Sequence, residues 1–351
     1  MKQPSLPMPQ GFSKRFESED VLVEKILKRG LSVSSEDELR RIIRITGYYR
    51  FTGYLYPFRK QGSDDYEKGT TLESIWRLYS FDRRLRLIAM DALARIEVAI
   101  RAKIMEAHSL HFGGDPFAYC DQSAMPGLKT KQFQPYLDSL DKAVRQARSA
   151  KDPAVLHHFA QYGESRVPVW VLFENLSFGD VAICYDGLPP PVQQVVANSF
   201  GIWPGPFKGW MKVLRRVRNI CAHQGRLWNR KIDARLSYSF SQDKSLADLY
   251  ACVSIQSSLP YTTVFTALSL CAWLIRVIRP ESKWTSRVKE LLADYPEVPL
   301  VAMGFPADWQ KLALWKEPDE EKEEDEAADS DKDSPPDPDS SASAPPAPAA
   351  K

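Results

Sequence analysis

The stretch from Thr71 to His108 contains neither glycine nor proline. Its apolar residues recur mostly at spacings of three and four, which is the period of one face of an α-helix. We therefore expect a single helix of unusual length, acting as the central rod of the fold. The apolar positions that carry this prediction are Ile75, Leu78, Tyr79, Leu85, Ile88, Ala89, Ala92, Leu93, Ile96 and Ile100.

Shorter segments elsewhere show the same helical period, while strand signals are scarce. A helix is expected over 18–28, and a second from Ser34 or Ser35 to near Gly47. The sequence therefore predicts an all-α fold, a multi-helix bundle with additional N-terminal helices. The remaining predicted helices cover 132–150, 154–162, 169–185, 191–199, 206–224, 246–257, 262–278 and 282–293.

An aromatic connector, YYRFTGYLYPFR, follows the second predicted helix over 48–59. Its Gly53 and Pro57 argue against one continuous helix. Its tyrosines, together with Arg50 and Arg59, either stack on RNA bases or pack into the core and close the loop. Core packing is the commoner role of such a cluster.

Charge is distributed unevenly along the chain. Residues 316–351 hold 13 acidic and 4 basic side chains, and from Glu317 they include seven prolines and no large apolar residue. We expect this tail to be disordered, because it cannot bury enough apolar surface to offset its ordering entropy. The rest of the chain carries a net charge of +11, which favours polyanionic partners or is merely a solvated surface. We expect 1–60 and 61–315 to form one globular unit, followed by the tail.

The cysteines and the apolar segments indicate where in the cell the protein is expected. Five cysteines are scattered without metal-ligand spacing, which is typical of reduced thiols in the cytoplasm. The first ten residues, MKQPSLPMPQ, have no apolar core typical of a signal peptide. The most apolar run, 261–278, includes threonines, Ser269 and Arg276, so we expect a buried helix and no membrane span.

The segment 208–230, KGWMKVLRRVRNICAHQGRLWNR, concentrates cationic side chains around one histidine. On a helix, Arg215, Asn219 and His223 fall on one stripe, four residues apart. Arg218 lies about 140° from His223 around the axis, so the two side chains do not share a face. A long arginine can swing part of the way, or two copies of the helix can face each other across a dimer axis.

These residue types suit cleavage of RNA by its own 2′-hydroxyl. Histidine can take or give a proton near neutral pH, and the arginine fork matches phosphate oxygens. Asn219 would hold the imidazole or contact the phosphate. No metal or other cofactor is expected, because no carboxylate–histidine cluster suggests one. The expected RNA contacts are Lys212, Arg215, Arg216, Arg226, Arg230 and Arg50.

Five separated motifs, in order and spanning roughly residues 15–315, resemble one family. They are ITGYYRFTGYLYPFR, FDRRLRLIAMDALARIEVAIRAKI, PVWVLFENLSFGDV, RNICAHQGRLWNR and MGFPADWQKLALW. The family is the Abi-like (AbiD/AbiF-type) abortive-infection family of the HEPN superfamily of helical ribonucleases. The resemblance implies a HEPN-type fold, a catalytic pair of Arg218 and His223 with Asn219 beside them, and a phage-defence toxin. It also implies dimers or paired domains that cut single-stranded or tRNA-like RNA, restrained in some members by a structured non-coding RNA. Because this chain has one copy of the motif, a homodimer is the simplest arrangement.

Other features leave alternatives open. In many relatives of this family a second histidine follows directly after the first, where this chain has Gln224, so the resemblance implies weaker activity here. Arg95 and Glu97 on the long helix either orient Arg218 or His223 across the bundle or form ordinary salt bridges. A non-catalytic RNA-binding scaffold is the main rival function, and a protein-binding regulator that uses the acidic tail is a weaker one.

Overall fold

The computed structural model describes residues 15–163, 166–234, 236, 246–256 and 258–316. Within these ranges the chain forms thirteen α-helices, no β-strand and three isolated β-bridges, which confirms the all-α prediction. The tail predicted to be disordered lies outside the described residues from Glu317 onward. The helices are α1 Glu19–Lys28, α2 Glu36–Thr46, α3 Tyr48–Leu55, α4 Leu72–His111, α5 Thr130–Ser149, α6 Pro153–Tyr162, α7 Val169–Glu174, α8 Phe178–Gly187, α9 Pro190–Asn198, α10 Pro204–Ala222, α11 Ala247–Val253, α12 Val264–Ile278 and α13 Trp284–Asp294.

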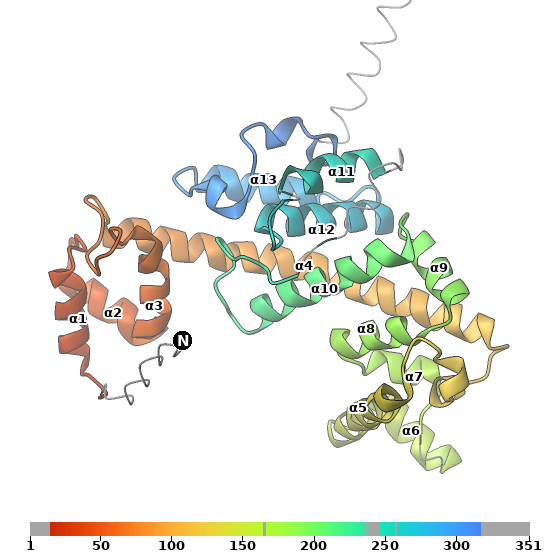
Figure 1. Ribbon diagram of the computed structural model, residues 1–351. Coiled ribbons are helices and arrows are strands. Elements are labelled where there is room, and N and C mark those ends of the chain that lie inside the picture. The colour runs from red at the N-terminus through yellow and green to blue at the C-terminus, as the bar shows by residue number, and fades with distance from the viewer. Residues whose placement is uncertain (1–14, 164–165, 235, 237–245, 257, 317–351) are drawn as a thin grey trace, which may run out of the picture.

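Helix α4 is the predicted central rod, and it contacts α3, α7, α8, α9, α10, α12 and α13. It begins after Thr71, whose side chain forms a capping box with Ser74. Helices α1–α3 gather at its N-terminal end, α11–α13 lie along one side, and α5–α9 surround its C-terminal half (Figure 1). Helix α10 crosses the middle of α4, so the predicted active helix lies at the centre of the molecule.

Two segments are divided differently from the sequence prediction. The segment 169–185 is divided into α7 and α8, because Ser177 begins a new helix through a capping box with Asp180. The aromatic connector forms α3 straight through Gly53, and then a 3₁₀ turn at Tyr56–Phe58. The prediction that the connector is not one continuous helix is confirmed, but the break comes at Pro57 and not at the glycine.

A single hydrophobic cluster runs through the bundle, with members from Val23 in α1 to Trp315. Trp210, Trp228, Trp284 and Trp315 are among its largest fully buried side chains. Two of them, Trp210 in α10 and Trp228 in the loop after it, anchor both sides of the predicted active segment. Among the residues that the structure describes, no helix combines the length and the apolar character needed to cross a membrane.

Candidate functional site

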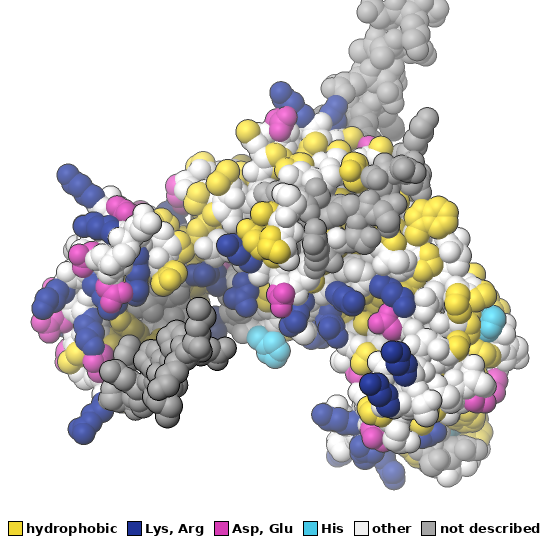
Figure 2. Space-filling view, viewed as in Figure 1, with side chains coloured by type: hydrophobic (Ala, Val, Ile, Leu, Met, Phe, Trp, Pro, Cys, Tyr) yellow, Lys and Arg dark blue, Asp and Glu magenta, His cyan; other side chains and the backbone are white. Residues whose placement is uncertain are grey.

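Helix α10 has one buried and one exposed face. Apolar side chains recur on the buried face at helical spacing, from Phe207 and Trp210 to Val217 and Cys221. Lys212, Arg216 and Asn219 are exposed on the opposite face. Burial of the apolar face fixes the rotation of α10, so the polar face has to point to solvent. In Figure 2, Lys and Arg side chains gather along the middle of the molecule in the region of α10.

The helix ends two residues earlier than predicted, at Ala222, so His223 is its C-cap and not an interior residue. The N–H of Gln224 bonds to the carbonyl of Cys221 at 3.0 Å, and the N–H of Gly225 bonds to that of Ile220 at 2.7 Å. This pair of bonds is the Schellman arrangement, which needs a left-handed residue after the C-cap. Gln224 takes that conformation, with φ at 57°. His223 is thus placed where the chain leaves the helix.

The exposed side of this helix end is a groove of about 320 Å³. Asn219 and His223 line it, together with Arg216, Arg230 and Lys231. Both Asn219 and His223 are exposed to solvent. We call this the His223 groove. The single carboxylate among its lining residues, Asp233, is fully exposed and lies 4.0 Å from Arg216, so the groove carries a net positive charge that suits a phosphate.

Arg218 does not line this groove. Its side chain turns toward α4, where its Nε lies 3.6 Å from an oxygen of Glu97. Glu97 is only 10% exposed in its side chain and also pairs with Arg101, which in turn donates to the carbonyl of Glu174 at 3.1 Å. Within one chain, Arg218 and His223 therefore occupy different faces of α10, as the helical geometry predicts.

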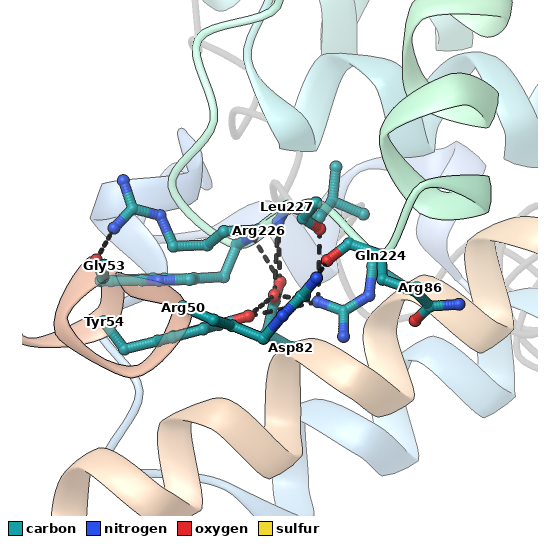
Figure 3. Close-up of polar contacts among 10 residues, drawn as sticks. Arg50, Gly53, Tyr54, Asp82, Arg86, Gln224, Arg226 and Leu227 are labelled. Carbon is teal, nitrogen blue, oxygen red and sulfur yellow. Dashed lines mark hydrogen bonds and ion pairs between the residues drawn. The ribbon is translucent and has the colours of Figure 1, made fainter. Parts of the chain in front are cut away.

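The loop after α10 is held by a buried carboxylate on the central helix, Asp82 (Figure 3). One oxygen of Asp82 accepts the backbone N–H of Trp228 at 2.7 Å and that of Leu227 at 3.0 Å. The other oxygen accepts the hydroxyl of Tyr54 at 2.6 Å and pairs with Arg86. Burial raises the pKa of the Asp82 carboxyl, and Arg86, Tyr54 and the two N–H groups oppose this by stabilising the anion.

Three arginines hold the same loop in place. Two of them bond to backbone carbonyls of the loop, and the third extends from the loop to α3. Arg86 reaches the carbonyl of Gly225 at 3.3 Å, and Arg50 donates to the carbonyl of Gln224. Arg226 donates to a carbonyl of α3. The residues that follow His223 are therefore fixed from both the central helix and the aromatic segment, which sets the shape of the site.

Between α3 and this loop lies a second hollow, of about 520 Å³. We call it the tyrosine–arginine cleft. It shares Gly225 and Arg230 with the His223 groove, so the two hollows adjoin. The side chains that characterise the cleft are Tyr49, Arg50, Tyr56, Arg59, Arg226 and Arg230.

Besides Arg218 and its partner Glu97, three of the predicted site residues lie apart from both hollows. Arg215 is half-buried, with its side chain close to Gly179 of α8. Lys212 is exposed nearly two turns before Asn219 and lines neither hollow. Arg95 pairs with Asp91 and lies 3.4 Å from Ser282, near α13. Gln224 lines the tyrosine–arginine cleft and is absent from the residues lining the His223 groove.

Comparison with known proteins identifies the family. The family model described as Abi-like protein matches residues 41–229, which is more than half of the chain. The chain belongs to the Abi-like family. No curated protein and no solved structure matches it. Membership suggests a part in abortive infection, a defence against phage. The matched span runs from α2 to the loop after α10, so it covers Asp82, Arg218 and His223 and stops just before Arg230.

The buried network of this Abi-like protein contains two charged residues that were not predicted from the sequence, Asp82 and Arg86, and it includes Tyr54 of the aromatic connector. A signal for Asp82 does exist, because it interrupts the buried series of Ile75, Leu78 and Leu85. A carboxylate at such a position needs a partner, and Arg86 stands four residues later. Its backbone partners are far away in the sequence, so spacing does not indicate them.

Neither a metal cluster nor a reactive thiol is found at this site among the described residues. Within the described ranges, no group of three or more His, Cys, Asp or Glu side chains is arranged to hold a metal ion. Cys221, directly before Ala222 on α10, is buried, and burial raises the pKa of its thiol to about 12. A thiol of that kind is a packing residue and a poor nucleophile.

Proposed function

We propose that this Abi-like protein is a cytoplasmic endoribonuclease toxin that cuts RNA during abortive infection without a metal, with a HEPN-type site. The observation that supports this best is the His223 groove. There, an exposed histidine and Asn219 share a hollow with Arg216, Arg230 and Lys231. A proton-transferring imidazole beside phosphate-binding cations is the minimum that RNA self-cleavage needs.

In the proposed reaction the 2′-oxygen of one nucleotide attacks its own 3′-phosphorus. The bond from phosphorus to the 5′-oxygen of the next nucleotide breaks, which leaves a 2′,3′-cyclic phosphate and a 5′-hydroxyl. One proton leaves the 2′-hydroxyl and one reaches the departing 5′-oxygen. His223 performs one of these transfers, and Asn219 holds the imidazole or the phosphate. Arginines stabilise the charge on the phosphorane.

Arg218 can take part in this reaction most simply if the protein is a homodimer. Glu97 holds it on the face of α10 away from the His223 groove. Beside Glu97, α4 has a stripe of exposed apolar side chains between the face that contacts α10 and the face that contacts α13. The stripe consists of Leu87, which is 60% exposed, Val98, which is 65% exposed, and the exposed Ala94. We propose that a second copy covers this stripe, so that Arg218 of one copy meets His223 of the other. The apolar stripe adjoins Arg218, which is why a second copy is favoured as its occupant.

The basic surface also suits a second RNA partner. The +11 charge of the chain up to Trp315 would attract a structured non-coding RNA that restrains the toxin. Purification of the protein under low salt, followed by sequencing of the RNA that stays bound, tests this part. A single abundant structured RNA is expected, and a random sample of cellular RNA would contradict the proposal.

The catalytic assignment is tested with purified wild type, His223→Ala and the control His111→Ala, which removes an exposed histidine at the end of α4. Wild type and His111→Ala should cut RNA and leave 2′,3′-cyclic phosphate ends, while His223→Ala should lose at least about 100-fold in rate. Cleavage by His223→Ala at the wild-type rate would contradict the catalytic assignment. Equal RNA binding by all three with no cleavage would favour the non-catalytic scaffold. Expression in bacteria should show the same ranking in growth arrest.

A further inference from the structure

We infer that the tyrosine–arginine cleft binds unpaired nucleotides of an RNA strand whose neighbouring phosphate lies in the His223 groove. The placement of the neighbouring phosphate in the His223 groove rests on the proposed function. The binding of unpaired RNA rests on the cleft alone.

The aromatic segment divides into buried and exposed side chains. Phe51, Tyr54 and Leu55 are at most 1% exposed and belong to the core. Tyr49 is 84% exposed and Tyr56 is 64% exposed, and both line the cleft. Core packing therefore explains the first group but not the second. Open tyrosine rings at a cleft wall provide faces on which bases can stack.

Three of the four arginines that line the cleft have no acidic partner among the described residues. Arg50 and Arg226 donate to backbone carbonyls, and within the described part of the chain neither they nor Arg230 has a carboxylate within ion-pair distance. Burial lowers the pKa of Arg226, which indicates that its charge is poorly solvated. Arg59 differs, because it pairs with Asp64 at 2.6 Å and lies over the ring of Tyr56. The cleft thus holds uncompensated positive charge beside aromatic faces, a combination suited to nucleotides.

The cleft continues into the His223 groove. Gly225 and Arg230 line both hollows, so a strand with one phosphate at His223 would place an adjacent nucleotide in the cleft that Tyr49 and Tyr56 line. The volume of about 520 Å³ lies in the range of small-ligand pockets. Paired RNA hides its base faces within the stack, so only an unpaired strand can use the tyrosines.

Binding is tested first, in a His223→Ala background that leaves the RNA intact. Fluorescence anisotropy with a 12-nucleotide single strand compares the parent with a Tyr49→Ala/Tyr56→Ala pair and a Tyr49→Phe/Tyr56→Phe pair. The alanine pair should bind at least about tenfold more weakly, and the phenylalanine pair should stay close to the parent, because stacking needs the ring and not the hydroxyl. Tyr162→Ala removes an equally exposed tyrosine on α6 and should have no effect. A hairpin duplex should not discriminate among the variants. Equal single-strand binding by the alanine pair would overturn the inference.

Cleavage separates the two proposals. With His223 intact, the alanine pair should cut the 12-nucleotide strand at least about tenfold more slowly than wild type, and the phenylalanine pair should cut it at the wild-type rate, because stacking needs the ring and not the hydroxyl. A protein that binds through the tyrosines but cuts nothing would refute the proposed function and keep the cleft. A protein that cuts the 12-nucleotide strand equally well with and without the tyrosine rings would refute the cleft and keep the function.

Discussion

The carboxylate of Asp82 on the central helix accepts a 2.7 Å hydrogen bond from the backbone N–H of Trp228, in the loop after the His223 helix. The same carboxylate pairs with Arg86 and is fully buried. One side chain of α4 therefore fixes the segment on which both hollows of the candidate site depend. The consequences of this contact can be measured.

Asp82→Asn should lower the free energy of unfolding by about 3 kcal/mol, because it leaves a buried guanidinium without its counter-ion. RNA cleavage should fall as well, since the loop that bounds the His223 groove loses its anchor. Urea denaturation gives the first quantity. The matched control is Asp91→Asn, which removes a carboxylate with the same spacing to its partner Arg95 on the same helix, but in a 37% exposed position. Asp91→Asn should lower the free energy of unfolding by less than about 1 kcal/mol. Equal losses of stability in both variants would contradict the role of Asp82 as the anchor of the loop.

A composite site at a dimer axis predicts complementation. Arg218→Ala and His223→Ala should each be inactive alone. In an equal mixture, half of the dimers hold one copy of each variant, and each such dimer keeps one intact Arg218–His223 pair out of two. Activity should therefore return to about one quarter of wild type. A mixture as inactive as its components would show that both residues act within one chain. Val98→Asp, on the exposed stripe of α4, should shift sedimentation toward the monomer and abolish the recovery.

Gln224→Gly should stabilise the protein by up to about 1 kcal/mol, because glycine adopts the left-handed conformation without the steric penalty of a side chain. The measured quantity is again the free energy of unfolding in urea. Ala222→Gly, one residue inside the helix end, is the comparison and should destabilise, since glycine is a poor interior helix residue. Stabilisation by both glycines would contradict the C-cap argument.

His108 predicts a pH dependence of stability. It is buried near the end of α4, neither ring nitrogen has a hydrogen-bond partner among the residues that the structure describes, and burial lowers its pKa to about 4. As the pH falls below 6.5, the unfolded chain takes up a proton that the folded protein refuses until about pH 4. Stability should thus be complete above pH 6.5 and decline by up to about 3 kcal/mol toward pH 4.

His108→Leu should remove that part of the decline, measured as the difference between the two proteins in urea unfolding from pH 7.5 to 4.5. Other groups titrate equally in both proteins, so the difference isolates His108. Parallel curves for the wild type and the variant would show that His108 is protonated in the folded state.

Most of the helices could be predicted from the sequence. The apolar period of α4 and the absence of glycine and proline predicted the rod, because local propensity and amphipathic spacing both act over a few residues. Helical geometry likewise predicted that Arg218 and His223 point to different faces of one helix. The helix end was misplaced by two residues, since only the bonds of Gln224 and Gly225 show where α10 stops.

The tertiary structure alone decided the surroundings of the site. Asp82 and Trp228 are 146 residues apart in the sequence, and Arg50 meets Gln224 across 174 residues. Such contacts depend on how whole helices pack, and no local pattern encodes them. Packing also divided the tyrosines of one aromatic segment into buried and exposed groups, because α3 turns one face toward the core and the other toward the loop after His223.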